Sequence, residues 1–490
     1  MSRSELLIRL SFSYFVDDGD APFALTAFGH TFYVITNAKH SAEVYKNTEA
    51  LSFEEFVQML MRTNGNDEQT IATVYSPLPV DKLGFPNPEG LSLGVLTQRM
   101  HVHQLHPGDP MAVLRSKAGD WISRQLRFDA LTKATRSYAV SVTPDHIQIP
   151  LCKWTSDHFV RLGQYVYFGH VLDKINPNYA DSYLVFDEVL WKMLYQYPNF
   201  LCHDMIKPRD EMMASLETYF KIPQNERRGE AAWIINAMEY EMRAIGVDNK
   251  NIAIMFFHLY FAINTNTRKT SFWMLTWLMR NPSWLTAFRE ETAPAFRGAE
   301  LVDGALIQDS SRCPHVDAVW HETLRMAGWA ASVRRVTRDG LVVGGRRLRQ
   351  GRRVMVPHRL LHFDEALFGA DPESWRPARW LALDGDGKTD GDDSNANVAP
   401  GAGAPGVATN KLSASPAWRP FGGGKTKCSG RFLAKYFVTT FVAVLLRRYD
   451  IQAVGEPPMP QPDVGRPVLG IISVKEGQDY VVSISERKEF

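Results

Sequence analysis

The sequence predicts a mainly α-helical fold with small β-sheets, and two observations support this class. From about Ser41 to Gly340, apolar residues recur at intervals of three and four, which is the spacing of amphipathic helices. Two other segments, residues 23–36 and 331–357, are instead rich in β-branched and aromatic residues around glycine turns. We therefore expect a helical body that carries two small β-rich regions.

Each predicted element rests on a local pattern. Residues 23–28 and 31–36 are rich in strand formers and flank Gly29, so we predict a strand pair with a turn at that glycine. Asp181 to Phe220 is predicted to be helical, because its apolar residues form a stripe at helical spacing. Residues 331–357 place valines around glycine turns, which predicts a second set of strands.

One segment differs from the rest in composition. Residues 384–415 consist mainly of Asp, Gly, Ala, Asn, Ser and Pro and contain no aromatic residue. Such a segment cannot bury enough apolar surface to offset the entropy lost on ordering. We predict a disordered insertion at the surface of one domain, because an ordinary pattern resumes at Trp418.

Charge and cysteine content exclude several classes of protein. The 490 residues hold 55 Lys and Arg against 54 Asp and Glu, so bulk charge gives no case for binding nucleic acid or an anionic membrane. Four cysteines are too few for a disulfide scaffold and favour a reducing compartment.

No stretch reaches the roughly 18–20 uncharged apolar residues that a membrane span needs. Ile252–Ile263 and Tyr436–Leu446 are the longest apolar runs, and we interpret both as buried helices. The first thirty residues do not resemble a signal peptide, so the sequence as it stands predicts a soluble chain.

The most informative segment surrounds Cys428. A run of three glycines precedes this cysteine, and a long apolar helix is predicted from Arg431. A thiolate at a helix N-terminus is stabilised by the helix dipole and by unpaired amides, and it can ligate a haem iron. Taken alone, a single cysteine beside a helix is more often a small core residue. Cys152, Cys202 and Cys313 lack any ligand motif and are predicted to be ordinary thiols.

Three motifs, in a fixed order, decide between these interpretations. They are Glu322-Thr-Leu-Arg325, then Pro377-Ala-Arg379-Trp380, then the set Phe421, Gly424, Cys428 and Gly430 in the spacing F-x-x-G-x-x-x-C-x-G. Together they resemble the cytochrome P-450 superfamily. The resemblance implies one haem domain over residues 1–490, with haem b (iron protoporphyrin IX) between a long central helix and the cysteine-loop helix. It implies that Cys428 is the axial ligand of the iron, that Phe421, Gly424 and Gly430 belong to the haem-binding loop, and that Glu322, Arg325 and Arg379 form a charge cluster beneath the haem.

The central helix of the family corresponds to Asn251–Asn281, and it departs from the usual A-G-x-D/E-T-T pattern. Thr265 stands in the place of the acid, Asn266 in the place of the first Thr, and Thr267 fills the second Thr position. This departure resembles the subgroup of prostacyclin synthase and the sterol 7α- and 12α-hydroxylases. We expect Asn266 near the iron, with proton delivery falling to Asn266, Thr267 and ordered water.

The same resemblance implies an arginine that contacts a haem propionate. Arg334 and Arg335 lie on the strand where this residue usually stands, and the spacing favours Arg335 slightly. Thr426 replaces the Arg or His often found two residues before the cysteine, so its contact could pass to Lys425 or Lys427. The W-x-x-x-R motif of many members is not recognisable near residues 95–120.

Three functions remain open. The leading hypothesis is a haem-thiolate monooxygenase that oxidises a bulky hydrophobic small molecule, using O2 and electrons from an NADPH-cytochrome P-450 reductase. The absent acid also permits an isomerase or dehydratase that acts on a peroxide without external electrons, as in the prostacyclin synthase branch. A haem-binding protein without catalysis is the third.

The resemblance also implies partners and a place in the cell. Five cations around the cysteine loop would suit an acidic reductase: Arg419, Lys425, Lys427, Arg431 and Lys435. Several phrases resemble filamentous-fungal members, which commonly serve secondary metabolism, and we expect a monomer. With an N-terminal anchor the protein would lie on the cytosolic face of the endoplasmic reticulum membrane, and otherwise in the cytoplasm. The substrate site is expected between the central helix and segments 85–110 and 180–225, with Phe186, Trp191 and Tyr195 among its apolar residues.

Overall fold

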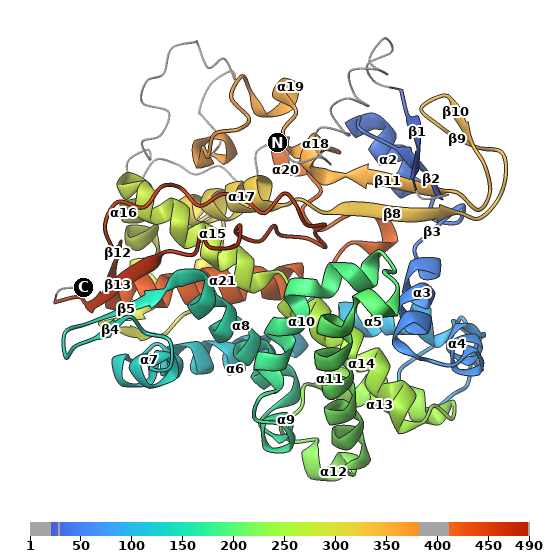
Figure 1. The fold of residues 1–490 in the computed structure, drawn as a ribbon, viewed down its shortest axis with the longest axis horizontal. Helices are drawn as coiled ribbons and strands as arrows, with labels where there is room; N and C mark the ends of the chain where they lie inside the picture. The colour runs from blue at the N-terminus through green and yellow to red at the C-terminus, as the bar shows by residue number, and fades with distance from the viewer. Residues whose placement is uncertain (1–20, 28–29, 382–410, 489–490) are drawn as a thin grey trace.

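The computed structural model describes residues 21–27, 30–381 and 411–488 (Figure 1). Most of the predicted disordered insertion, and the predicted turn at Gly29, lie outside these residues. The end of the insertion was predicted wrongly, because Lys411–Ala414 form a short helix, α20. Ser415 continues the ordered chain, since its amide donates to the carbonyl of Leu412.

The fold is mainly helical, as predicted. The first helices are α2 (Ala38–Lys46), α3 (Glu54–Asn64), α4 (Glu68–Tyr75), α5 (Leu93–Leu105), α6 (Asp109–Gln125), α7 (Phe128–Thr135), α8 (Leu151–Phe168) and α9 (Val171–Ile175). The middle of the chain forms α10 (Tyr179–Leu194), α11 (His203–Lys221), α12 (Gln224–Arg227), α13 (Trp233–Ala244), α14 (Asn249–Asn264), α15 (Thr267–Arg280) and α16 (Pro282–Thr292). The last helices are α17 (Pro314–Ala327), α18 (His358–His362), α19 (Glu365–Phe368) and α21 (Arg431–Arg448).

Both predicted β-rich regions meet in one sheet. Its order is β1-β2-β11-β8-β3, from Phe23–Ala27, His30–Val34, Arg353–Pro357, Ala331–Val336 and Leu51–Ser52. The predicted hairpin is antiparallel with Phe23 opposite Val34, and β2 then pairs in parallel with β11. A two-stranded extension holds β9 (Leu341–Val343) and β10 (Arg346–Leu348).

A second sheet was not predicted. Its order is β12-β13-β5-β4, from Tyr449–Ala453, Val481–Glu486, His146–Pro150 and Ser141–Val142. A small pair, β6 (Phe296–Arg297) and β7 (Glu300–Leu301), was also missed. Two-residue strands are too short to produce a pattern of alternating burial in the sequence.

The predicted helical stretch from Asp181 to Phe220 is two helices rather than one. Leu194 ends α10 and His203 begins α11, and the two helices pack against each other and beside α14 (Figure 1). The connection between them contains Gln196 at φ 51°, which is an unusual backbone conformation for a side chain other than glycine. Apolar periodicity alone did not reveal this break, because the stripe continues on both sides of it.

The predicted central helix is also interrupted. Asn264 ends α14 and Thr267 begins α15, so Thr265 and Asn266 form the junction between two helices rather than the middle of one. Asp248 caps the start of α14, where its side chain accepts a hydrogen bond from the amide of Asn251. Thus the positions predicted to carry the oxygen chemistry fall where the helix departs from regular geometry.

The helix after the cysteine lies at the centre of the molecule. α21 packs against α6 and α15, and from Tyr436 to Leu446 it is buried throughout. By length and composition, residues 424–448 would suffice to span a membrane, but most of this segment is buried inside the fold. One apolar core that extends from Leu60 to Ile484 surrounds it, and a smaller core lies beside the five-stranded sheet. The prediction of a buried helix is therefore confirmed.

Candidate functional site

The loop before α21 places Cys428 at the start of that helix. The Cys428 amide donates to the carbonyl of Phe421 at 3.0 Å, which closes the loop, and residues 424–426 form the short 3-10 turn η6 (Gly424–Thr426). Burial raises the pKa of the Cys428 thiol, and the backbone N–H groups of Gly430 and Arg431, which point at the sulfur, partly oppose that rise. Unpaired amides at the start of a helix therefore face the sulfur, as the sequence analysis expected.

One motif glycine is required by its backbone. Gly424 has φ +64°, and a Cβ atom there would lie 2.7 Å from the carbonyl oxygen of Tyr45. Both the left-handed conformation and this approach to rigid backbone exclude a side chain. At Gly430 a Cβ would meet only the Cys428 sulfur, at 3.9 Å, so in this structure the residue contributes through its amide.

The Cys428 side chain combines two properties that rarely occur together. It is exposed, yet burial is the largest influence on its thiol and raises the pKa. The sulfur is therefore surrounded by protein while one side remains open. Ala262, on the last turn of α14, is also exposed although most of that helix is buried. Cys152, Cys202 and Cys313 are free thiols, the last two buried.

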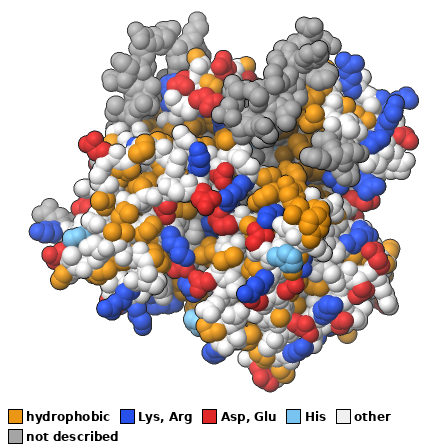
Figure 2. All heavy atoms as spheres, in the orientation of Figure 1, with side chains coloured by type: hydrophobic (Ala, Val, Ile, Leu, Met, Phe, Trp, Pro, Cys, Tyr) orange, Lys and Arg blue, Asp and Glu red, His pale blue; other side chains and the backbone are white. Residues whose placement is uncertain are grey.

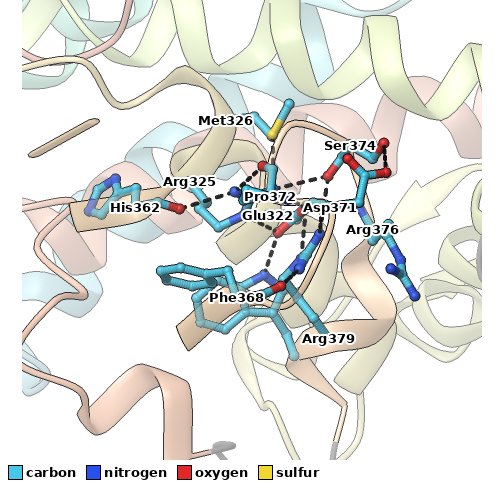
Figure 3. Close-up of polar contacts among 11 residues, drawn as sticks. Glu322, Arg325, Met326, His362, Phe368, Asp371, Pro372, Ser374, Arg376 and Arg379 are labelled. Carbon is cyan, nitrogen blue, oxygen red and sulfur yellow. Dashed lines mark hydrogen bonds and ion pairs between the residues drawn. The ribbon is translucent and has the colours of Figure 1, made fainter. Parts of the chain in front are cut away.

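The three residues predicted to form a charge cluster meet around one carboxylate (Figure 3). Glu322 is fully buried and accepts hydrogen bonds from Arg325 at 2.8 and 2.9 Å and from Arg379 at 3.1 Å. The amide of Arg376 and the indole of Trp380 also donate to it, at 2.7 and 2.8 Å. Every lone pair of this buried anion has a donor, which is the condition under which a buried charge is stable.

Arg325 uses its remaining donors to hold a distant segment. Its guanidinium is fully buried and donates to the carbonyls of His362 at 3.1 Å, Pro372 at 2.7 Å and Ser374 at 3.0 Å (Figure 3). These carbonyls lie 37 to 49 residues away in the sequence. The pair on α17 therefore fixes the course of the chain that leads towards the cysteine loop.

Arg334, rather than Arg335, faces the cysteine loop, so the geometry favours Arg334 for the propionate contact where the sequence slightly favoured Arg335. Arg335 is exposed and pairs with Glu55 at 3.2 Å. Arg334 is buried, lies over the ring of Phe53 and donates to the hydroxyl of Thr426. Strand alternation explains the difference, because Arg334 shares its face of β8 with buried Val336.

A polar cluster that the sequence analysis missed adjoins this arginine. The Tyr45 hydroxyl donates to Ser332 Oγ at 2.8 Å, and Ser332 Oγ lies 3.0 Å from His358 Nε2. Arg419 lies over the Tyr45 ring, and its buried Nε has no hydrogen-bond partner among the described residues. Only the long-range packing of α2 and β8 against the loop brings these residues together, so no local sequence pattern could have shown them.

Only some of the cations that were predicted to dock a reductase have side chains exposed to solvent. Arg419 turns inward to Tyr45, and Lys435 pairs with Asp317 at 2.5 Å. Lys425 and Lys427 are exposed, and neither has an ion pair among the residues that the structure describes. Arg431 donates back to the carbonyl of Cys428.

At the junction of the central helix, Asn266 and Thr265 have partners on different elements. Asn266 Oδ1 accepts from the amide of Ile471 at 2.9 Å, and a Cβ on Gly470 would collide with the same side chain. Thr265 is buried and hydrogen bonds to Asp187 on α10, while Thr267 is buried in α15. Positions 265 and 266 therefore lie at a junction that the sequence did not reveal, and Asp187 was missed as a partner of Thr265.

The predicted substrate residues divide between core and surface. Phe186 is fully buried against Phe257 of α14, with ring centroids 5.0 Å apart. Trp191 packs edge-on against Tyr197, and Tyr195 is exposed. Phe186 thus supports the central helix, whereas the other two lie towards the outer end of α10.

Comparison with known proteins agrees with this arrangement. A profile described as Cytochrome P450 matches residues 170–474, which is more than half of the chain and contains all three motifs. The chain belongs to the cytochrome P450 family. "Cytochrome P450 monooxygenase poxD" of Penicillium oxalicum is 25% identical over 455 residues, covering 89% of this chain and 81% of that protein.

Two other relatives match a smaller share of this chain. "Cytochrome P450 monooxygenase nodJ" of Hypoxylon pulicicidum is 24% identical over 58% of this chain and 52% of its own length. "5-beta-cholestane-3-alpha,7-alpha-diol 12-alpha-hydroxylase" of Sus scrofa is 26% identical over 49% of this chain and 46% of its own. The sterol hydroxylase agrees with the resemblance that the central helix suggested.

The residues of this P450 fit a haem. Cys428 offers an accessible sulfur with two amides aimed at it. Ala262, on α14, is an exposed small residue. Arg334 and Arg419 are cations, buried or partly so, with no carboxylate partner among the described residues, as expected for groups that bind propionates. When bound, the haem supplies the iron chemistry that activates dioxygen. Cys428 would ligate the iron, Arg334 and Arg419 would neutralise the propionates, and the helix junction would order polar groups.

Proposed function

We propose that this P450 is a monooxygenase that oxidises a bulky hydrophobic small molecule with O2 and electrons from an NADPH-cytochrome P450 reductase. The observation that carries the proposal is the accessible Cys428 sulfur at the start of α21, in a chain that also carries the motifs of Glu322, Arg325 and Arg379. Exposed Lys425 and Lys427 beside it offer a positive surface on which an acidic electron donor can dock.

The substrate class is inferred from the aromatic layer around the helix junction. Buried aromatic side chains of α10 and α14 pack together there, with Phe186 against Phe257 and Phe257 against Phe261. A site beside such an apolar layer would favour apolar ligands of some size. The two fungal relatives named above support a role in fungal secondary metabolism, and we place this protein there as part of the proposal.

We also propose contact with the endoplasmic reticulum membrane on its cytosolic face. The connection from α10 to α11 exposes a group of large apolar side chains: Tyr195, Tyr197, Phe200 and Leu201. Figure 2 shows hydrophobic side chains gathered on the face that includes the end of α10. An exposed apolar patch of this kind suits a lipid surface.

Labelled dioxygen tests the reaction directly. Purified holoprotein with reductase and NADPH is offered a panel of terpenoid, alkaloid and polyketide metabolites from fungi under ¹⁸O2. We expect one oxygen atom of the label in a product and no product without NADPH. A product that forms without NADPH and carries no label would instead support the isomerase, which the absence of an acid on the central helix favours.

The ligation itself has a separate test. Cys428→Ala should abolish the thiolate-type absorption of the reduced carbon monoxide complex. Cys313→Ala is the matched control, because that thiol is buried elsewhere and should leave the spectrum unchanged. Persistence of the thiolate spectrum in Cys428→Ala would refute the proposed function.

A further inference from the structure

A buried carboxylate from another helix contacts the junction of the central helix. Asp187, on α10, has no exposed side-chain surface and accepts a hydrogen bond from the Thr265 hydroxyl at 2.8 Å. The hydroxyl of Tyr183, one turn earlier on α10, lies 2.8 Å from Thr265 Oγ1 and 3.1 Å from Asp187. The chain therefore places an acid beside the position where the central helix itself lacks one.

Two cations of α15 keep this acid ionised. Arg268 donates to Asp187, and the Lys269 ammonium lies 3.1 Å from the same carboxylate. These cations outweigh the effect of burial and hold the pKa of Asp187 well below its ordinary value. Arg268 also donates to Ser156 of α8 at 2.8 Å, so three helices share the cluster. Asp187 is thus a permanent acceptor in the neutral range.

A narrow polar cleft leads from the surface to this cluster. Its volume is about 40 Å³, which is room for roughly two or three water molecules. Its lining includes Asp187, Thr265 and Lys269 from the cluster. It also includes Asp463 and Arg466 from the C-terminal segment. Such polar walls give each water several partners, so ordered water is favoured there.

Thr265 connects the cleft to the junction of the central helix. Thr265 precedes Asn266, whose side chain holds Ile471, and lies three residues after Ala262, which is exposed. The Thr265 hydroxyl has two possible acceptors, Asp187 and the carbonyl of Phe261, both at 2.8 Å. Because a hydroxyl donates only once, it can change acceptors without moving the backbone.

We propose that Asp187 replaces the acid missing from the central helix, as a positioning residue that acts through Thr265 and the water of the cleft to deliver protons to the helix junction. Each proton comes from bulk solvent, passes along the water of the cleft to the Thr265 hydroxyl, and leaves that hydroxyl for a water molecule at the junction beside Asn266. Every donor in the chain regains a proton from the one behind it, and Asp187 keeps its charge throughout. This inference rests on the proposed monooxygenase function.

The test compares two acids of α10. Asp187→Asn keeps the shape and removes the charge, while Asp181→Asn changes a half-exposed acid that pairs with Arg161 and neither lines the cleft nor contacts Thr265. The probe is NADPH oxidation by the reductase-coupled holoprotein in H2O and in D2O, since reduction of O2 by NADPH consumes solvent protons. Absorption spectra of the ferric protein and of its reduced carbon monoxide complex establish that each variant retains ligated haem.

We expect Asp187→Asn to slow NADPH oxidation by at least about tenfold and to raise the solvent isotope effect, with both spectra unchanged. Asp181→Asn should stay within about twofold of the wild type. If Asp187→Asn fails to hold haem, Thr265→Val tests the same path, and Thr265→Ser should restore it. A merely structural role would not change the isotope effect, so wild-type rates and isotope effects in Asp187→Asn and Thr265→Val would overturn the inference. A wild type that consumes no NADPH would instead refute the proposed function, and the inference with it.

Discussion

Neutralising Glu322 should be among the most damaging isosteric substitutions in the protein. Glu322→Gln preserves the shape of the side chain but removes the only carboxylate within ion-pair distance of Arg325 among the described residues, and a partner of Arg379. It also replaces one acceptor oxygen by an NH2 group, so either the Arg376 amide, which donates to one oxygen, or the Trp380 indole, which donates to the other, loses its acceptor. The Arg325 guanidinium would then lie in the interior with no carboxylate among the described residues to compensate its charge.

The size of the effect follows from burial. Arg325 and Glu322 have no exposed side-chain surface, and Arg379 has 9%. Removing one partner of a buried ion pair costs about 3–5 kcal/mol, which is a large share of the roughly 5–15 kcal/mol that stabilises a typical domain. At about 2 °C per kcal/mol for a large domain, Tm should fall by roughly 6–10 °C.

The control is the exposed pair that Arg359 forms with Glu373 at 3.1 Å, in the same region of the fold. Glu373 is 68% exposed, so Glu373→Gln should cost at most about 1 kcal/mol. Thermal unfolding of the two holoproteins, followed by circular dichroism and by haem absorbance, measures both effects. Equal Tm values for the two variants would refute the claim that the buried cluster holds this part of the fold together.

Three further predictions use neighbouring or matched residues. Arg334→Leu should speed the transfer of haem to apomyoglobin, while Arg335→Leu should not. The reason is that only Arg334 faces the cysteine loop. Similar rates of haem loss in the two variants would contradict the assignment. Gly424→Ala should reduce haem incorporation more than Gly345→Ala, since both glycines have positive φ but only Gly424 meets backbone at 2.7 Å; equal yields would contradict this. Burial lowers the pKa of His158 to about 3, so the unfolded state takes up a proton that the folded state refuses, and stability falls as the pH drops from about 6.5 towards 3. His158→Phe should flatten Tm against pH in that window, and an unchanged slope would contradict it.

The parts of the site that the sequence could predict are those set by local geometry. Glu322 and Arg325 lie three residues apart, which on a helix is one face, and the structure joins them by two hydrogen bonds. The cysteine loop also follows local geometry, because the backbone conformation at Gly424 requires a glycine. The choice between Arg334 and Arg335 was also within reach, since alternation on a strand places Arg334 with the apolar Val336.

The other features depend on contacts between distant segments. Asp187 and Thr265 are 78 residues apart, and nothing in either local pattern indicates that they meet. The breaks after Leu194 and Asn264 were missed because apolar periodicity records which face is buried, not whether the backbone is continuous. Tyr45 reaches Ser332 across 287 residues, which is beyond any motif.

The location of Asp187 bears on how the altered helix pattern is interpreted. An acid at position 265 would lie within hydrogen-bond distance of Asp187, and two carboxylates so close cannot both stay ionised without cost. Arg268 and Lys269 are already engaged by Asp187, so a second acid would compete for the same cations. A threonine at 265 avoids that repulsion and still connects the carboxylate to the junction. The acid is thus absent from the motif but present in the site, and its absence from the motif is weaker support for a reaction without proton delivery than the sequence alone suggested.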